Sequence, residues 1–137
     1  MKKMREGYYA SWWFDAVYRQ NYYLLIRAKA EDVEKYFKQN LRIEYKATGT
    51  PSGRIIPFVK NDSDRAGIVI WIEKWNRTPF DYATLAHEML HAADYTLKER
   101  HVEWGNSTND INEAQAYYFG YLMRKALNEI ATLSDTY

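Results

Sequence analysis

The sequence predicts an α+β domain in which helices pack on one side of a small, mostly antiparallel sheet. Strand-like patterns, either alternating or compactly apolar, fill most of the first half of the chain up to Trp75. The pattern then changes at Thr78, and two long helical segments follow. A length of 137 residues suits one hydrophobic core, so residues 1–137 are assigned to a single domain.

The first forty residues predict one strand and one short helix. Aromatic residues crowd residues 8–18, where a short helix and an irregular segment packed on the core both fit. Residues 22–28 form a compact apolar run rich in strand formers, which predicts a strand. Residues 31–40 begin with acids and carry apolar side chains at helical spacing, which predicts a short helix.

The next segment predicts a hairpin followed by a strong strand. Residues 41–47 alternate apolar and charged side chains, as a half-buried strand does. A turn-rich stretch separates them from residues 54–60, a second strand in which Pro57 indicates a sheet edge or a bulge. Residues 68–75 are dense in β-branched and aromatic side chains and predict the strongest strand of the chain.

The second half of the chain predicts two helices. Thr78 suits the N-cap, Pro79 the first helical position and Asp81 the third, so a helix should run from here to about Glu99. Residues 102–110 have the polar, glycine-containing composition of a loop. A final helix is expected over about residues 111–131.

The charge, apolar runs and cysteine content of the chain argue against several classes of partner and site. The net charge is +1 and no block of one sign occurs, so neither nucleic acid nor an anionic membrane surface is indicated. No stretch approaches 18 apolar residues, so no membrane span is expected, and the first residues lack the apolar run of a signal peptide. Cysteine is absent, which excludes disulfides and cysteine metal sites and favours the cytoplasm.

Aromatic residues are unusually frequent, at 17% of the chain with 13 Tyr and 5 Trp. Rings carry large contact areas and favour strands, so a small sheet-rich core padded with aromatics is expected. A binding surface for peptide or sugar is the alternative.

The strongest chemical signal is the HEMLH segment, residues 87–91, which matches the H-E-x-x-H pattern. His87 and His91 are four residues apart and project from one side of a helix, so both imidazoles can reach one ion. Glu88 lies about 100° around the helix from His87. It can therefore flank a metal without binding it and accept a proton from water. The alternative is that the match is accidental and the segment is an ordinary helix with two exposed histidines.

A catalytic zinc ion has three protein ligands and a water, so a third ligand is needed. The candidates are His101, Asp94 and Glu113. The extended three-histidine motif requires Gly and His where this chain has Asp94 and Leu97, so that class does not fit. Asp94 shares the helical face of the histidines and is better placed to accept a hydrogen bond from one of them. His101 follows charged residues and indicates a solvated position.

HEMLH together with Glu113, which lies 22 residues past His91, resembles the gluzincin arrangement of zinc peptidases. The sequence EAQAYYFGYL at residues 113–122 is also similar to small phage and prophage HExxH proteins described as metallopeptidases. The resemblance implies a zincin-like fold and Zn²⁺ held by His87, His91 and Glu113. The thermolysin-type pattern has Asp where this chain has Tyr117, so the hydrogen bonds around the metal must differ. A capping role for Glu113 is the plain alternative.

The resulting expectation is a zinc-dependent peptidase acting on a peptide or protein substrate. Glu88 would be the general base, and Tyr117 is a candidate donor to the oxyanion. An extended peptide would bind beside the helix along the strand at residues 68–75. The competing expectation is a zincin-scaffold protein without catalysis that binds a host or phage partner through its aromatic surface. Glu88 favours the enzyme, because a binding scaffold does not require an acid there.

Overall fold

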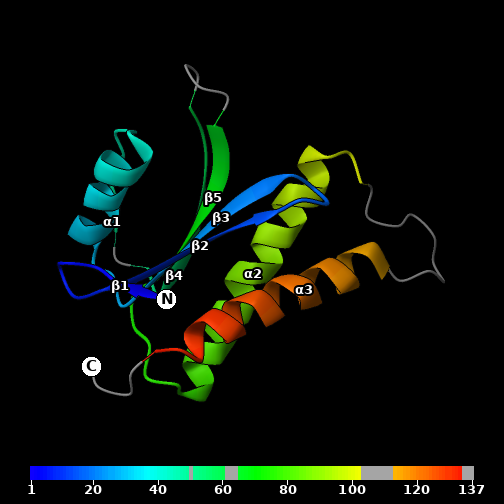
Figure 1. The fold of residues 1–137 in the computed structure, drawn as a ribbon. Coiled ribbons are helices and arrows are strands. Elements are labelled where there is room, and N and C mark those ends of the chain that lie inside the picture. The colour runs from blue at the N-terminus through cyan, green and yellow to red at the C-terminus, as the bar shows by residue number, and fades with distance from the viewer. Residues whose placement is uncertain (50, 61–64, 103–112, 134–137) are drawn as a thin grey trace.

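The computed structural model describes residues 1–49, 51–60, 65–102 and 113–133, and a five-stranded sheet lies at its centre (Figure 1). The strands are β1 (Lys2–Lys3), β2 (Tyr9–Asp15), β3 (Gln20–Ile26), β4 (Gly53–Lys60) and β5 (Arg65–Ile72). Their order in the sheet is β1-β2-β3-β5-β4. Only the β3–β5 pair is parallel. The predicted α+β class with a mostly antiparallel sheet is confirmed.

Helices cover both faces of the sheet (Figure 1). The long helices α2 (Pro79–Glu99) and α3 (Glu113–Ile130) pack on one face, as predicted. The short helix α1 (Ala30–Tyr36) continues into one π-helical turn, η1 (Phe37–Leu41), and covers the other face. The expectation that all helices share one side is therefore wrong for α1. No described helix is long and apolar enough to cross a membrane.

The central strands explain why both faces are covered. In β3, Tyr22 and Leu24 face the long helices, whereas Tyr23 and Leu25 face α1 and η1. β5 alternates in the same way, and its residues from Ile68 to Ile72 are fully buried. A strand that is apolar on both sides needs a layer on each, which gives two separate cores.

The N-terminal aromatic segment forms β2, a strand that the sequence reading did not assign. Trp13 is buried against the long helices, but Trp12 and Phe14 on the opposite face are 58% and 47% exposed. A half-buried strand is normally recognised by alternating apolar and polar residues. Here aromatic residues occupy the exposed side as well, so the alternation is absent from the sequence.

The predicted hairpin is wrong, because β4 pairs with β5 and residues 42–47 form no strand. This segment instead lies against α1 and η1. The ring of Tyr45 stacks on Phe37 with centroids 4.6 Å apart, and the Ala47 amide donates to Glu34 at 2.8 Å. Its alternating side chains therefore pack on helices and not in a sheet.

β4 is an edge strand, as Pro57 predicted: within the described residues it pairs on one side only, with β5. The predicted strand at residues 68–75 corresponds to β5, which ends at Ile72. It has β3 on one side and β4 on the other, so it cannot accept a further strand. The expectation that a peptide would bind along it is wrong, and the free edge beside α2 belongs to β4.

The predicted start of α2 is confirmed. The Asp81 amide donates to the Thr78 hydroxyl at 3.2 Å, and the Asp81 carboxylate accepts from the amides of Thr78 and Asn76. Pro79 occupies the first turn, and the helix ends at Glu99. The last helix is confirmed over Glu113–Ile130. The predicted loop falls, from residue 103 onward, outside the described residues.

Candidate metal centre

The HEMLH segment occupies the middle of α2 and presents two converging imidazoles. The Nε2 atoms of His87 and His91 lie 3.1 Å apart, and both side chains are exposed. Their rings are nearly perpendicular, at 79°, with centroids 4.6 Å apart. The two Nε2 atoms thus lie within hydrogen-bonding distance of each other on the same side of the helix.

This separation fits a tetrahedral metal ion. Zinc–imidazole bonds are about 2.0–2.1 Å long, and nitrogens 3.1 Å apart then subtend roughly 100° at the ion. That angle is close to tetrahedral. The donor pair therefore suits two of the four positions around zinc.

Glu88 lies next to this pair but in a different environment, because it is only 7% exposed. The residue that covers it is Gly53, the first residue of β4. A Cβ on Gly53 would lie 2.9 Å from Cγ of Glu88 and 2.8 Å from Cγ2 of Thr84. Only glycine permits so close an approach. The edge strand therefore packs on α2 against the side-chain stem of Glu88.

Burial raises the pKa of Glu88 above its ordinary value, and the charges of His87, His91 and Arg54 oppose this rise. Desolvation is the largest of these causes, because burial disfavours the charged form of a carboxyl group. A carboxylate with a raised pKa is a stronger proton acceptor, which suits a general base.

Two pockets flank Glu88 along the line where α2 meets β4. One, of about 500 Å³, is lined by Ile55 of β4 and by His91, Asp94, Tyr95, Lys98 and Glu99 of α2. The other, of about 320 Å³, includes Ser52, Phe80 and Thr84 and lies toward the start of α2. The motif thus lies between one hollow beside β4 and another beside residues 51–52, just before β4 begins.

The neighbouring candidates Asp94 and His101 do not contact the imidazole pair through a hydrogen bond. Asp94 lines the pocket of His91, but its carboxylate pairs with Lys98 at 3.1 Å. His101 is exposed in the turn after α2 with a φ of 59°, in agreement with the predicted surface position.

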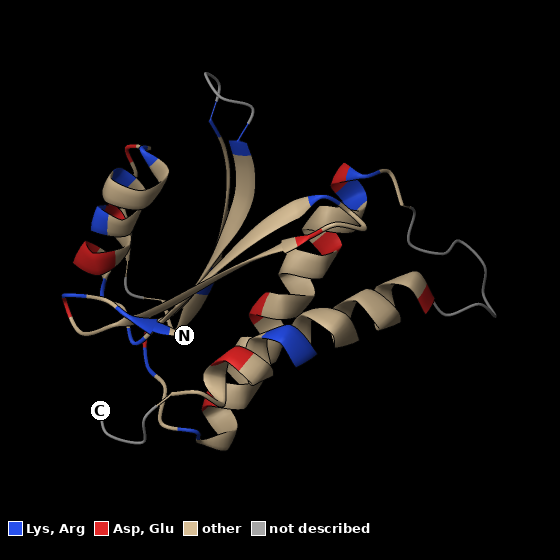
Figure 2. Ribbon diagram, viewed as in Figure 1, with Lys and Arg blue, Asp and Glu red and all other residues tan. Residues whose placement is uncertain are grey.

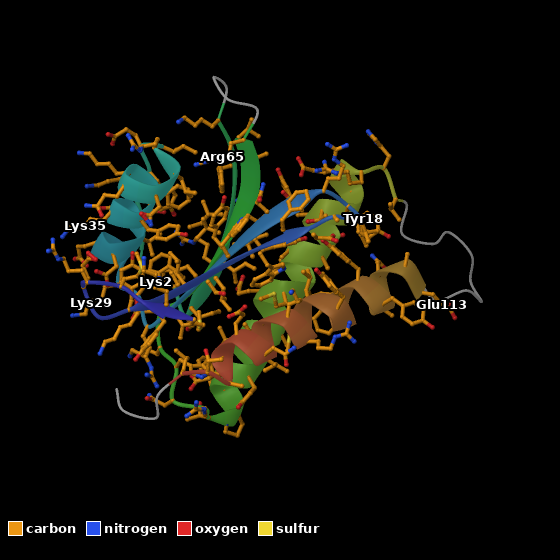
Figure 3. The ribbon with its side chains drawn as sticks, in the orientation of Figure 1. Lys2, Tyr18, Lys29, Lys35, Arg65 and Glu113 are labelled. Carbon is orange, nitrogen blue, oxygen red and sulfur yellow. The ribbon has the colours of Figure 1, made fainter. Side chains whose placement is uncertain are left out.

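Glu113 is not brought together with the two histidines. It is the exposed first residue of α3, and Figure 3 shows it at the end of that helix that lies away from α2. Among the described residues, no three of His, Cys, Asp and Glu form a group that could hold a metal ion. Its ligand role stays a prediction, and the alternative capping box with Asp110 lies outside the described residues.

Tyr117 also lies elsewhere. It is 75% exposed on α3 and lines a pocket with Asp15 and Tyr18, to which no residue of HEMLH contributes. Its role as a donor to the oxyanion stays a prediction that these contacts do not support.

Gly53 and Arg54 are the site residues that the sequence reading missed. Gly53 closes over Glu88, and the charge of Arg54 acts on its carboxylate. The only local sign was a glycine at the start of a predicted edge strand, which often marks a close backbone approach.

No family model, curated protein or solved structure matches this chain.

Proposed function

We propose that this protein is a zinc-dependent peptidase centred on HEMLH. The observation that carries the proposal is the geometry of α2, where two imidazole nitrogens converge at 3.1 Å beside a buried carboxylate. A helix without such a function has no need for an acid held in an apolar contact next to two histidines.

In this proposal His87 and His91 hold the metal through their Nε2 atoms. Glu113 is the proposed third ligand, supported by its spacing from the motif and not by its position in the structure. When bound, zinc supplies a Lewis acid that acidifies water and polarises a carbonyl group.

Glu88 moves the proton. Its carboxylate accepts a proton from the attacking water and later passes it to the leaving amine. Its burial against Gly53 limits the orientations of the side chain and excludes bulk water from one side. General acid–base catalysis of this kind contributes about 10²–10⁴-fold in rate.

The proposed substrate is an extended peptide bound along the free edge of β4. An edge strand offers unpaired backbone groups that a peptide can use as an added strand. Gly53 lies against Glu88, and Ile55 shares a pocket with His91. A peptide on this edge would therefore pass the motif, with a pocket on each side for its side chains. The absence of cysteine supports a further proposal that it acts in the cytoplasm.

Metal content tests the ligands. Purified protein should contain one zinc per chain, His91→Ala should lose it, and His101→Ala should keep it as a matched control. Zinc-free protein after growth in zinc would refute the proposal. Full occupancy in Glu113→Ala would remove only the third-ligand assignment.

Turnover tests the base. Glu88→Gln should keep zinc and lose about 10²–10⁴-fold in kcat on a peptide library. A variant with unchanged zinc and unchanged kcat would show that Glu88 does not move the proton.

A non-catalytic binding protein is the second candidate, favoured by the exposed rings of Trp12 and Phe14 on β2. Large exposed aromatics are enriched where proteins bind partners. This candidate predicts a zinc-free, inactive protein whose capture of a partner protein is lost in Trp12→Ala.

A further inference from the structure

A third pocket, separate from the HEMLH segment, lies between the β2–β3 turn and the first half of α3. Its volume is about 390 Å³. The turn contributes Asp15, Val17 and Tyr18, and α3 contributes Ala114, Tyr117, Tyr118 and Tyr121. Figure 3 shows Tyr18 reaching toward the space between α2 and α3. Four of the seven described lining residues are tyrosines, so ring surfaces dominate the described walls.

Three of the tyrosine rings that line the pocket contact one another. Tyr18 meets Tyr118 edge to face, with centroids 4.7 Å apart and planes at 70°. Tyr118 stacks on Tyr121 at 5.9 Å with planes only 11° apart. Tyr117 stands largely exposed at the rim. The face of an aromatic ring carries negative electrostatic potential and attracts cations.

Asp15 adds a formal negative charge to these walls. It is 3% exposed and accepts from the amides of Val17 and Tyr18 at 3.0 and 3.3 Å, and it contributes to the raised pKa of Tyr118, of which burial is the largest cause. No ion pair joins it to a basic residue in the described part of the chain. Buried carboxylates are normally paired with a cation, so this one lacks its usual partner.

Arg100, which follows α2, contacts the same turn, but its guanidinium donates to the carbonyl oxygens of Tyr18 and Arg19 at 2.7 and 2.8 Å and not to Asp15. Figure 2 shows no charged residue on α3 between Glu113 and Arg124. Arg124 is exposed and acts electrostatically on Tyr121, whose pKa is raised first by burial and then by the charge of Asp15. The pocket is therefore an aromatic recess with an unpaired carboxylate in its wall.

We propose that this pocket binds an organic ammonium ion, with its methyl or methylene groups against the tyrosine rings and its charge balanced by Asp15. A metal ion would require several oxygen ligands, and among the described residues Asp15 alone contributes a carboxylate to the pocket. A neutral apolar ligand would leave the buried charge uncompensated, and an anion would be repelled. The volume lies within the usual range for small-molecule sites, about 300–1,000 Å³. The site does not depend on the peptidase proposal.

Choline and its uncharged isostere 3,3-dimethyl-1-butanol form a matched probe pair, followed by ¹H–¹⁵N NMR titration of the full chain. Choline should bind with a Kd of about 1 mM or tighter. It should shift the amides of Tyr18 and Tyr121 and bind at least about tenfold more tightly than the alcohol. Equal binding of the two probes, or no saturable binding of choline, would overturn the proposal. A trimethyllysine peptide used as a third probe shows whether a free ligand or a side chain is preferred.

Two variants separate recognition of charge from apolar contact. Tyr117→Leu keeps apolar bulk on an exposed position but removes the ring, so choline should bind about twofold to fivefold more weakly while the alcohol is unaffected. Asp15→Asn keeps an acceptor for the turn amides and should weaken choline about tenfold or more. Phe80→Leu, at an exposed aromatic on α2, is the control. If Asp15→Asn does not fold, Tyr117→Leu decides alone, and choline affinity equal to wild type would refute the proposal.

Discussion

Replacing Gly53 with alanine should weaken both the fold and the proposed turnover, because β4 and α2 leave no room for a side chain between them. The added Cβ would lie 2.8 Å from Thr84 Cγ2, 2.9 Å from Glu88 Cγ and 3.2 Å from Ile72 Cδ1. Ordinary van der Waals contact begins at 3.4 Å, so the first two distances fall about 0.5–0.6 Å short. Either the strand must move outward or Glu88 and Thr84 must leave their positions.

The expected loss of stability follows from two opposing effects. Overpacking a close contact costs about 1–3 kcal/mol. Alanine restricts the unfolded chain more than glycine does, which returns about 0.4–1 kcal/mol. The net destabilisation should be about 1–2 kcal/mol. For a domain of this size, each kcal/mol lowers the Tm by about 4 °C, so a fall of about 4–8 °C is expected.

Thermal unfolding by circular dichroism measures this shift, and Gly120→Ala is the matched control. A Cβ on Gly120 meets nothing within 4 Å, and the residue lies inside α3, where alanine should stabilise by up to about 1 kcal/mol. The proposed enzyme should also lose kcat in Gly53→Ala while zinc content stays constant, because Glu88 moves and the histidines do not. A Gly53→Ala protein as stable as the wild type would show that β4 does not pack this closely on α2.

Three further substitutions test the cores and the helix start by chemical denaturation. Tyr118→Phe removes a buried hydroxyl that is hydrogen-bonded to Tyr22, so the free energy of unfolding should fall by about 1–3 kcal/mol, and an unchanged value would contradict the buried network. Asp81→Ala removes the acceptor for the Thr78 amide at the start of α2 and should cost about 1–2 kcal/mol, whereas a neutral effect would show that the cap is dispensable. Leu97→Ala empties a fully buried position and should cost about 2–5 kcal/mol, and a loss below 1 kcal/mol would place this residue outside the core.

Features encoded by neighbouring residues were predictable from the sequence. The start of α2 needs only Thr78, Pro79 and Asp81 in fixed order, because each satisfies a helix terminus three or fewer residues away. The convergence of His87 and His91 likewise follows from the pitch of one helix. Pro57 marked an edge strand because proline cannot donate to a neighbouring strand.

The sequence did not predict which strand or helix each segment packs against. Residues 42–47 alternate as a strand should, but alternation shows which side chains are buried and not what buries them. Here Tyr45 packs on Phe37 of η1, so the segment pairs with no strand. β4 then pairs with β5, which follows it in the chain, so the strand along which a peptide was expected to bind is an interior one.

In the candidate site, too, some features follow from neighbouring residues and others from contacts with distant residues. HEMLH places Glu88 about 100° from His87, but that angle alone does not decide whether the carboxylate is solvated. Gly53, which is 35 positions earlier in the chain, lies against its Cγ atom, and Glu88 is only 7% exposed. The resulting burial is the largest cause of the raised pKa of Glu88. A motif on one helix thus supplies the groups of the proposed reaction, whereas a distant glycine at a strand edge packs against one of them, with the free edge of β4 beside it.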